Sequence, residues 1–172
     1  MSKPRSAGGT PATVALSRAG VTFILHPYEH RPDATSYGDE AAQAIGVDPH
    51  RVFKTLLTEL VGAGGGTELA VAVVPVARQL DLKAMAAACG AKKATMADPA
   101  VASRSTGYVL GGISPLGQRT RLRTVLDASA TSYETIFVSA GKRGLQVELA
   151  PTDLVEVTSA LLEPIGVAGP TG

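Results

Sequence analysis

The order of apolar and polar residues along the chain predicts short helices and strands that follow one another without strict alternation. A helix is predicted wherever a capping residue precedes proline or an apolar stripe with helical spacing. These helices cover residues 11–19, 40–45, 82–89, 99–105 and 152–159. Runs of apolar and β-branched residues predict strands at 22–26, 52–61, 69–76, 93–96, 121–127, 135–139 and 145–149. This mixture indicates a single α/β domain with a mixed sheet.

Local capping signals mark where the helices begin. Thr10 precedes Pro11, a residue well suited to the first helical position, and Gly20 follows the last apolar position of that segment. Ser36 and Asp39 have the spacing of a capping box. We therefore expect the first two helices to begin at side chains that bond to the exposed backbone amides.

The predicted strand at 52–61 places a lysine among apolar residues. Because strand side chains alternate between two faces, Lys54 shares a face with Val52 and Leu56. A lysine on an apolar face is costly unless its ammonium group meets an anion or a carbonyl oxygen. Lys54 is therefore a candidate for holding a phosphate or carboxylate, and extension of its side chain to water at the sheet edge explains the pattern equally well.

Two further features are compatible with ligand binding. Glycines at Gly111 and Gly112 would let a ligand reach backbone N–H donors, as an oxyanion site requires, and a tight turn would use the same residues. Basic residues alternate along one predicted strand face and recur in a hairpin turn. They are Arg119, Arg121 and Arg123 in the strand, and Lys142 and Arg143 in the turn. These groups suit a backbone phosphate, although a solvated surface explains them as well.

Composition narrows the classes of function. The 172 residues are 45% hydrophobic and 18% charged, which fits one globular domain. Only 4% are aromatic and tryptophan is absent, which argues against modules that stack several RNA bases on aromatic side chains. A formal net charge of +1 supplies no general attraction for a polyanion. We expect a domain at 10–167 between flexible tails at 1–9 and 168–172.

The chain has one cysteine, which excludes an internal disulfide and indicates a reducing compartment. No stretch approaches the roughly 18 consecutive apolar residues of a membrane span. We therefore expect a cytoplasmic protein without a membrane partner.

Other candidate motifs favour structural roles. The segment Gly62–Thr67 lacks the Lys-Ser/Thr pair of a phosphate loop and joins two predicted strands, so it is interpreted as a hairpin loop. His26 and His30 are four residues apart, but a proline between them disfavours the helix that a zinc site would need. Cys89 belongs to an apolar helical stripe, and Ser114 lacks the flanking glycine of a nucleophile elbow. We predict no metal site and no cofactor.

Three segments in a fixed order resemble a known family. They are 52–56 (VFKTL), 107–115 (GYVLGGISP) and 137–145 (FVSAGKRGL), with 10–12 (TPA) near the start. Together they resemble the YbaK/EbsC family of aminoacyl-tRNA deacylases, most closely its Cys-tRNA(Pro) deacylase branch. The resemblance extends from about Thr10 to Ser159.

The resemblance implies a fold and an activity. The fold would be a compact α/β domain with a mixed, mostly antiparallel and partly barrel-like sheet, surrounded by helices as in the editing domain of prolyl-tRNA synthetases. The activity would be trans-editing, the hydrolysis of the ester in cysteine wrongly attached to tRNA(Pro). The implied partners are the acceptor end of the mischarged tRNA(Pro) and, in a transient complex, prolyl-tRNA synthetase, with no DNA.

The resemblance also assigns roles to individual positions. Lys54 would hold the acceptor end of the substrate, and Gly111 and Gly112 would offer backbone donors around the scissile carbonyl. Ser139 lies in the matching pocket segment, Tyr28 matches a tyrosine on the pocket rim, and Gln146 stands where some members carry aspartate. The complete implied set of substrate-binding residues is Tyr28, Ser139, Lys142, Arg143 and Gln146.

The sequence leaves alternatives open for both the attacking group and the substrate. No serine, cysteine or histidine stands out as a nucleophile, so the attacking group would be water or the thiol of the substrate. The resemblance favours the thiol. A related deacylase acting on alanine or another small amino acid, and an inactive module that binds tRNA or a synthetase, are the competing interpretations.

Overall fold

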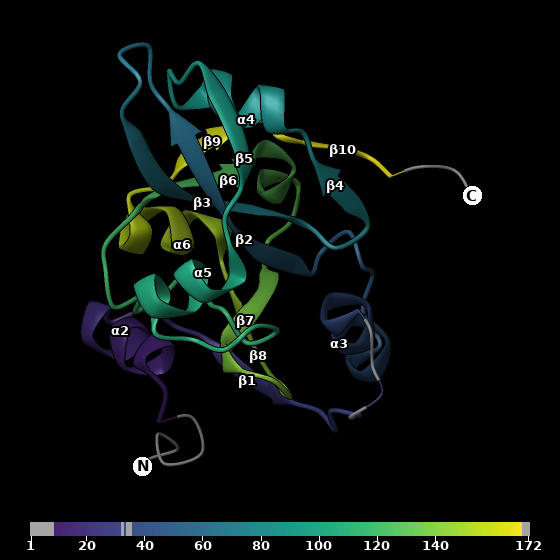
Figure 1. Ribbon diagram of the computed structural model, residues 1–172. Helices are drawn as coiled ribbons and strands as arrows, with labels where there is room; N and C mark the ends of the chain where they lie inside the picture. Colours follow the sequence, from purple (N-terminus) through teal and green to yellow (C-terminus); the bar gives the residue numbers. More distant parts are fainter. Residues whose placement is uncertain (1–8, 32, 34–35, 170–172) are drawn as a thin grey trace.

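The computed structural model describes residues 9–31, 33 and 36–169, and Figure 1 shows their arrangement. Five α-helices and ten strands are found among these residues. The helices are α2 (Pro11–Ala19), α3 (Tyr37–Ile45), α4 (Leu82–Ala88), α5 (Pro99–Thr106) and α6 (Pro151–Thr158). The strands are β1 (Ile24–Pro27), β2 (Phe53–Val61), β3 (Thr67–Pro75), β4 (Arg78–Leu80), β5 (Lys93–Met96), β6 (Arg123–Asp127), β7 (Ile136–Lys142), β8 (Leu145–Leu149), β9 (Leu161–Glu163) and β10 (Gly166–Ala168).

The strands form three sheets. The largest has the order β5-β2-β3-β6-β9, in which β2 and β3 form an antiparallel hairpin and β3, β6 and β9 run parallel. A second sheet, β1-β8-β7, is antiparallel, and β10 pairs with β4. A parallel bridge between Val52 and Phe137 joins the first two sheets beside the start of β2. The predicted α/β domain with a mixed, mostly antiparallel sheet is confirmed.

The partly barrel-like part of that prediction is wrong for the residues described. A barrel requires its first and last strands to pair, whereas β5 and β9 remain the two edges of the five-stranded sheet. The bridge at Val52 connects the two sheets only locally. The two sheets therefore meet at the start of β2, beside the β7–β8 hairpin.

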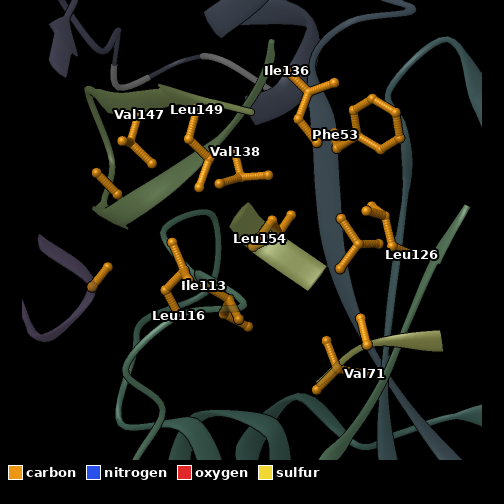
Figure 2. Packing of buried hydrophobic residues seen from close by; sticks show 14 of the residues in the cluster. Phe53, Val71, Ile113, Leu116, Leu126, Ile136, Val138, Val147, Leu149 and Leu154 are labelled. Atoms are coloured by element: carbon orange, nitrogen blue, oxygen red, sulfur yellow. The ribbon is translucent and has the colours of Figure 1, made fainter. Parts of the chain in front are cut away.

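The main hydrophobic core lies between the two larger sheets, and Figure 2 shows its side chains pointing toward one another. Val71 and Leu126 come from the five-stranded sheet, whereas Val138 and Leu149 come from the three-stranded one. All four are at most 1% exposed. Since complete burial of such a side chain contributes roughly 1.5–3 kcal/mol, this core fixes the relative position of the sheets.

The capping predictions have different outcomes. Thr10 forms a reciprocal capping box with Thr13, and Gly20 ends α2 in the left-handed conformation, as the sequence predicts. The capping box at Ser36 is wrong, because its hydroxyl donates to the Asp39 carboxylate at 2.8 Å rather than bonding to the backbone. The helix itself forms at 37–45.

Two predictions about basic residues are corrected. Arg119 and Arg121 do not share a strand face with Arg123, because β6 begins only at Arg123. Their guanidinium groups instead contact the carbonyl of Arg104 and the hydroxyl of Ser159. The hairpin between β7 and β8 is tighter than predicted, since β7 continues to Lys142 through an irregular pairing after Ser139.

The predicted tails lie mostly outside the residues that the structure describes. Residues 1–8 and 170–172 lie outside the described residues, so the limits of the domain stay a prediction. Ala168, assigned to the second tail, is the last residue of β10 and pairs with Arg78. The strands β4, β9 and β10, each three residues long, are too short to give a periodic signal in the sequence.

Candidate active site

A cavity of about 320 Å³ opens at the corner where β2 begins. Its walls come from the start of α3, the first half of β2, the loop after α5, and the β7–β8 hairpin. The lining residues are Ser36, Tyr37, Gly38, Val52, Phe53, Lys54, Thr55, Leu56, Leu110, Gly111, Ile113, Ser139 and Gln146. Four residues singled out from the sequence, Lys54, Gly111, Ser139 and Gln146, are thereby brought together.

The helix α3 reaches this cavity through a close backbone approach. A Cβ atom on Gly38 would overlap the side chain of Val76, which follows the end of β3. Only glycine permits this separation. The contact holds the first turn of α3 over the start of β2, where Lys54 lies.

Lys54 is the cation of the cavity. Its side chain is half-buried, and burial lowers the pKa of its ammonium group, an effect that the charge of Asp39 partly opposes. Within the described part of the chain, the ammonium forms no ion pair and no hydrogen bond. A partly desolvated cation that forms no ion pair among the described residues is well suited to an anionic or partly negative group of a ligand.

The two glycines of the loop have different surroundings. Gly111 lines the cavity with φ +86°, and a Cβ atom on it would lie 2.8 Å from Cδ2 of Tyr37. Gly112 does not line the cavity, and its N–H donates to the carbonyl of Val109 at 2.9 Å. A Cβ atom there would lie 2.8 Å from Cα of Lys142. Gly112 therefore closes a turn, whereas Gly111 lies in the cavity wall, and a donor role for its backbone stays a prediction.

Gln146 contributes an unpaired acceptor. It lies in the central strand β8, opposite Ser139 of β7 and His26 of β1, and is 6% exposed. Its Oε1 atom is buried without a hydrogen-bond partner among the described residues, and the same holds for Oγ1 of Thr55. Ser139, in contrast, accepts from the N–H of Gly141 at 3.1 Å. An orphaned buried acceptor costs about 1–3 kcal/mol, which a ligand with a donor would recover.

Three predicted binding residues lie outside the cavity wall. Tyr28 lines a neighbouring groove of about 490 Å³ between β1 and α3. Burial raises the pKa of its hydroxyl, and hydrogen bonds from the Gly144 backbone and the Gln146 side chain oppose this shift. Lys142 and Arg143 lie in the hairpin at the mouth, both exposed.

Tyr37 is the lining residue that sequence reasoning missed. The Arg143 guanidinium carbon lies 4.9 Å from the centre of its ring, and the His30 ring lies 5.8 Å away in a tilted arrangement. His30 in turn pairs with the largely buried Glu40 at 2.8 Å. Nothing in the local sequence marks Tyr37, because its partners come from distant segments of the chain.

The remaining candidates have structural roles. Cys89 is buried in a second apolar cluster against α4, where burial raises the pKa of its thiol. Ser114 is fully buried and accepts the N–H of Leu116. His26 pairs with Glu148 at 2.8 Å, and Gly62–Thr67 connects β2 to β3 as a hairpin loop. None of these side chains lines the cavity.

The described residues contain neither a cluster of metal ligands nor a membrane-spanning helix. No group of three or more histidine, cysteine, aspartate or glutamate side chains gathers there in a way that would hold a metal ion. In the same part of the chain, no helix is long and apolar enough to cross a membrane. The described lining offers one cation, the backbone of Gly111 and two residues with a buried oxygen that has no partner, Gln146 and Thr55, which suits a small acyl group attached to a polar or charged leaving group.

Comparison with known protein families gives a specific match. The model of the aminoacyl-tRNA editing domain matches residues 31–157. A protein of Enterococcus faecalis with the provisional name Cys-tRNA(Pro)/Cys-tRNA(Cys) deacylase EbsC is 36% identical over 159 residues, covering 92% of this chain and 94% of that protein. The uncharacterized protein YwhH of Bacillus subtilis is 30% identical over 118 residues, covering 69% of this chain and 72% of that protein.

Solved structures show the same fold. A crystal structure provisionally described as a trans-editing enzyme for prolyl-tRNA synthetase superposes with a TM-score of 0.77 at 24% identity, covering 98% of this chain and all of that one. The hypothetical protein APE2540 superposes with a TM-score of 0.78 at 24% identity, covering 91% of this chain and 99% of that one.

Proposed function

This chain belongs to the family of aminoacyl-tRNA editing domains and is an aminoacyl-tRNA deacylase, and we propose that it removes cysteine from wrongly charged tRNA(Pro). The relative from Enterococcus faecalis carries this substrate in its name. The observation that carries the proposal is the cavity of about 320 Å³ that both Lys54 and Gln146 line, with the Oε1 atom of Gln146 buried and unpaired among the described residues. A synthetase pocket for proline excludes a similarly small amino acid by only roughly 10–200-fold, so a separate hydrolytic site is needed.

Gln146 is proposed to select the amino group of the substrate. A cysteinyl ester carries a primary ammonium with three donors, and its binding would satisfy the buried Oε1 atom. The apolar walls at Phe53 and Ile113 suit the short side chain of cysteine. Ser139, opposite Gln146 on β7, would complete this end of the pocket.

Lys54 and the glycine loop are proposed to hold the reacting end. The Lys54 ammonium would bind the acceptor end of the tRNA, where its charge stabilises negative charge that develops on oxygen. Gly111 would present its backbone edge to the ester carbonyl, while Gly112 keeps the turn closed through its bond to Val109. Tyr28, beside Gln146, would position that amide from the neighbouring groove.

The thiol of the substrate is the proposed nucleophile. Its sulfur forms a bond to the carbonyl carbon while the bond from that carbon to the ribose oxygen breaks. The thiol proton passes to the released ribose oxygen, which becomes a hydroxyl group. Water then opens the cyclic thioester and frees cysteine. This route agrees with a cavity whose described lining has no cysteine or histidine side chain.

Partners and location belong to the same proposal. The small, nearly neutral chain would gain selectivity for tRNA(Pro) in a transient complex with prolyl-tRNA synthetase, in the cytoplasm. Association with the synthetase in the presence of tRNA, measured by pull-down, would support the complex. No association with or without tRNA would contradict it.

A panel of charged tRNAs tests the proposed substrate. The wild-type chain should hydrolyse Cys-tRNA(Pro) faster than Ala-tRNA(Pro) and leave Pro-tRNA(Pro) intact. The Lys54→Ala variant should lose this activity. The control variant Lys83→Ala should keep it, because Lys83 is an exposed residue on α4. Faster hydrolysis of Ala-tRNA(Pro) than of Cys-tRNA(Pro) would show that alanine, not cysteine, is the preferred amino acid. No hydrolysis of any charged tRNA would refute the proposal.

A further inference from the structure

We propose that Arg143, held against Tyr37 at the mouth of the cavity, binds the phosphate of the nucleotide that carries the ester. The inference rests on the proposed function, because it concerns the nucleotide end of the same substrate. It assigns a binding role to an arginine–tyrosine pair whose two residues come from separate elements, the β7–β8 hairpin and α3.

The guanidinium group is positioned before any ligand binds. Nε of Arg143 donates to the carbonyl oxygen of Leu110 at 2.8 Å, and Cζ lies 4.9 Å from the centre of the Tyr37 ring. The Tyr37 ring also lies 5.8 Å from the ring of His30, which the largely buried Glu40 holds at 2.8 Å. Two contacts on an exposed arginine reduce the entropy that it would lose on binding a ligand.

The charge of Arg143 is available to a ligand. In the described residues, no carboxylate pairs with its guanidinium group, and the only hydrogen bond recorded for its side chain uses Nε. Arg123 differs, because it pairs with Glu68 at 2.9 Å. A planar guanidinium with two free nitrogens matches the oxygens of a phosphate in a bidentate arrangement.

The position of Arg143 fits the nucleotide next to the ester. A Cβ atom on Gly111 would lie 2.9 Å from Nε of Arg143, so the guanidinium group lies directly against the loop that is proposed to face the ester carbonyl. The ester joins the amino acid to the terminal ribose, whose phosphate must lie outside the cavity. The exposed mouth at Leu110 and Arg143 is the edge that the nucleotide would pass.

Arg18 provides a matched control. It carries the same guanidinium group and is also exposed, but it lies in the last turn of α2, it does not line the cavity, and no side-chain contact is recorded for it among the described residues. Its replacement by alanine changes the net charge by the same amount as Arg143→Ala. Arg143 should therefore contribute more to binding than Arg18.

Kinetics at several salt concentrations test the phosphate contact. Arg143→Ala should raise KM for Cys-tRNA(Pro) by roughly 10- to 100-fold with little change in kcat, the effect of a lost charge-assisted hydrogen bond. It should also reduce the slope of log KM against log salt concentration by about 0.7, as expected for one contact to a single strand. Arg18→Ala should change KM by about twofold or less. An unchanged KM and slope in Arg143→Ala, or an equal effect of Arg18→Ala, would overturn the inference.

Inhibition by small nucleotides distinguishes a contact with the phosphate from contacts with the base and ribose. Adenosine 5′-monophosphate should inhibit the wild-type enzyme more strongly than adenosine, and Arg143→Ala should abolish this difference. An equal difference in both proteins would contradict a phosphate contact at Arg143. Direct titration of the wild-type chain and Arg143→Ala with the nucleotide needs no turnover, so its result is independent of the proposed substrate. Absence of turnover on all charged tRNAs would instead refute the proposed function.

A double-mutant cycle tests the part played by Tyr37. Tyr37→Leu should raise KM through the loss of the support for Arg143, whereas Tyr37→Phe, which keeps the ring, should behave as wild type. The double variant Tyr37→Leu/Arg143→Ala should have the KM of Arg143→Ala alone, because both changes remove one interaction. Additive effects would show that Tyr37 acts independently of Arg143 and would overturn its role as a positioning residue.

Discussion

Gly111 packs so closely beneath Tyr37 that a Cβ atom on it would lie 2.8 Å from Cδ2 of that ring. Its backbone is also left-handed, with φ +86°. The loop therefore approaches α3 and the Arg143 side chain only because this position has no side chain.

Gly111→Ala should abolish most of the activity, because the new methyl group displaces the loop from Tyr37. Gly65→Ala is a matched control, since Gly65 has φ +87° in the β2–β3 loop with open space around its Cβ position. The control should lose only about 1–2 kcal/mol of unfolding free energy and keep kcat/KM. Equal activity of both variants would show that the close packing at Gly111 has no part in the site.

Lys54→Met should stabilise the protein while inactivating it. Burial lowers the pKa of Lys54 below its ordinary 10.5, so folding disfavours the charged form. This cost is complete below the lowered pKa and disappears as the pH rises to the unfolded value. The stability difference between the variant and wild type should therefore shrink at alkaline pH, measured by urea unfolding from neutral pH upward. A difference that grows with pH would contradict this assignment.

Gln146→Leu should separate binding from stability. Removal of the unpaired Oε1 atom relieves a buried orphan, so the free energy of unfolding should stay the same or increase. Activity should fall by about 5- to 150-fold in kcat/KM, since the ammonium of the substrate would lose its acceptor. Thr55→Val, which removes the other orphaned oxygen, controls for the stability effect. Full activity in Gln146→Leu would exclude the proposed contact.

Cys89→Ser should leave the deacylation rate within about twofold of wild type, because Cys89 lies in the core cluster at α4 and not in the cavity. The hydroxyl should cost about 1–3 kcal/mol of stability in this apolar setting. Single-turnover rates and thermal unfolding measure the two effects. Loss of activity without loss of folded protein would point to a thiol of the enzyme as the nucleophile.

Local physical signals explain which elements could be predicted. The cap at Thr10, the buried stripe ending at Cys89 and the hairpin loop at Gly62–Thr67 each depend on residues close in sequence, and all three were predicted. The alternation around Lys54 was likewise sufficient to single out a lysine that the fold leaves half-buried beside a cavity.

Predictions failed where a competing side-chain contact or a distant partner decides the outcome. Ser36 has the spacing of a cap, but its hydroxyl bonds to the Asp39 side chain instead. Arg121 has the spacing of a strand residue, yet pairing of β6 with β3 begins at Arg123. The five-stranded sheet stays open because its edge strands, β5 and β9, do not pair with each other. A local sequence pattern carries no information on whether two distant strands pair.

The sequence by itself determined the helices and the strands of four or more residues, the family and four of the residues that line the cavity, because backbone periodicity, capping and glycine placement act over a few neighbouring residues. Only the tertiary structure decided that Gly111 faces the cavity while Gly112 closes a turn, and that Tyr37 supports Arg143 at its mouth. These relationships join segments far apart in the chain, and the packing of the two sheets against each other sets their distances.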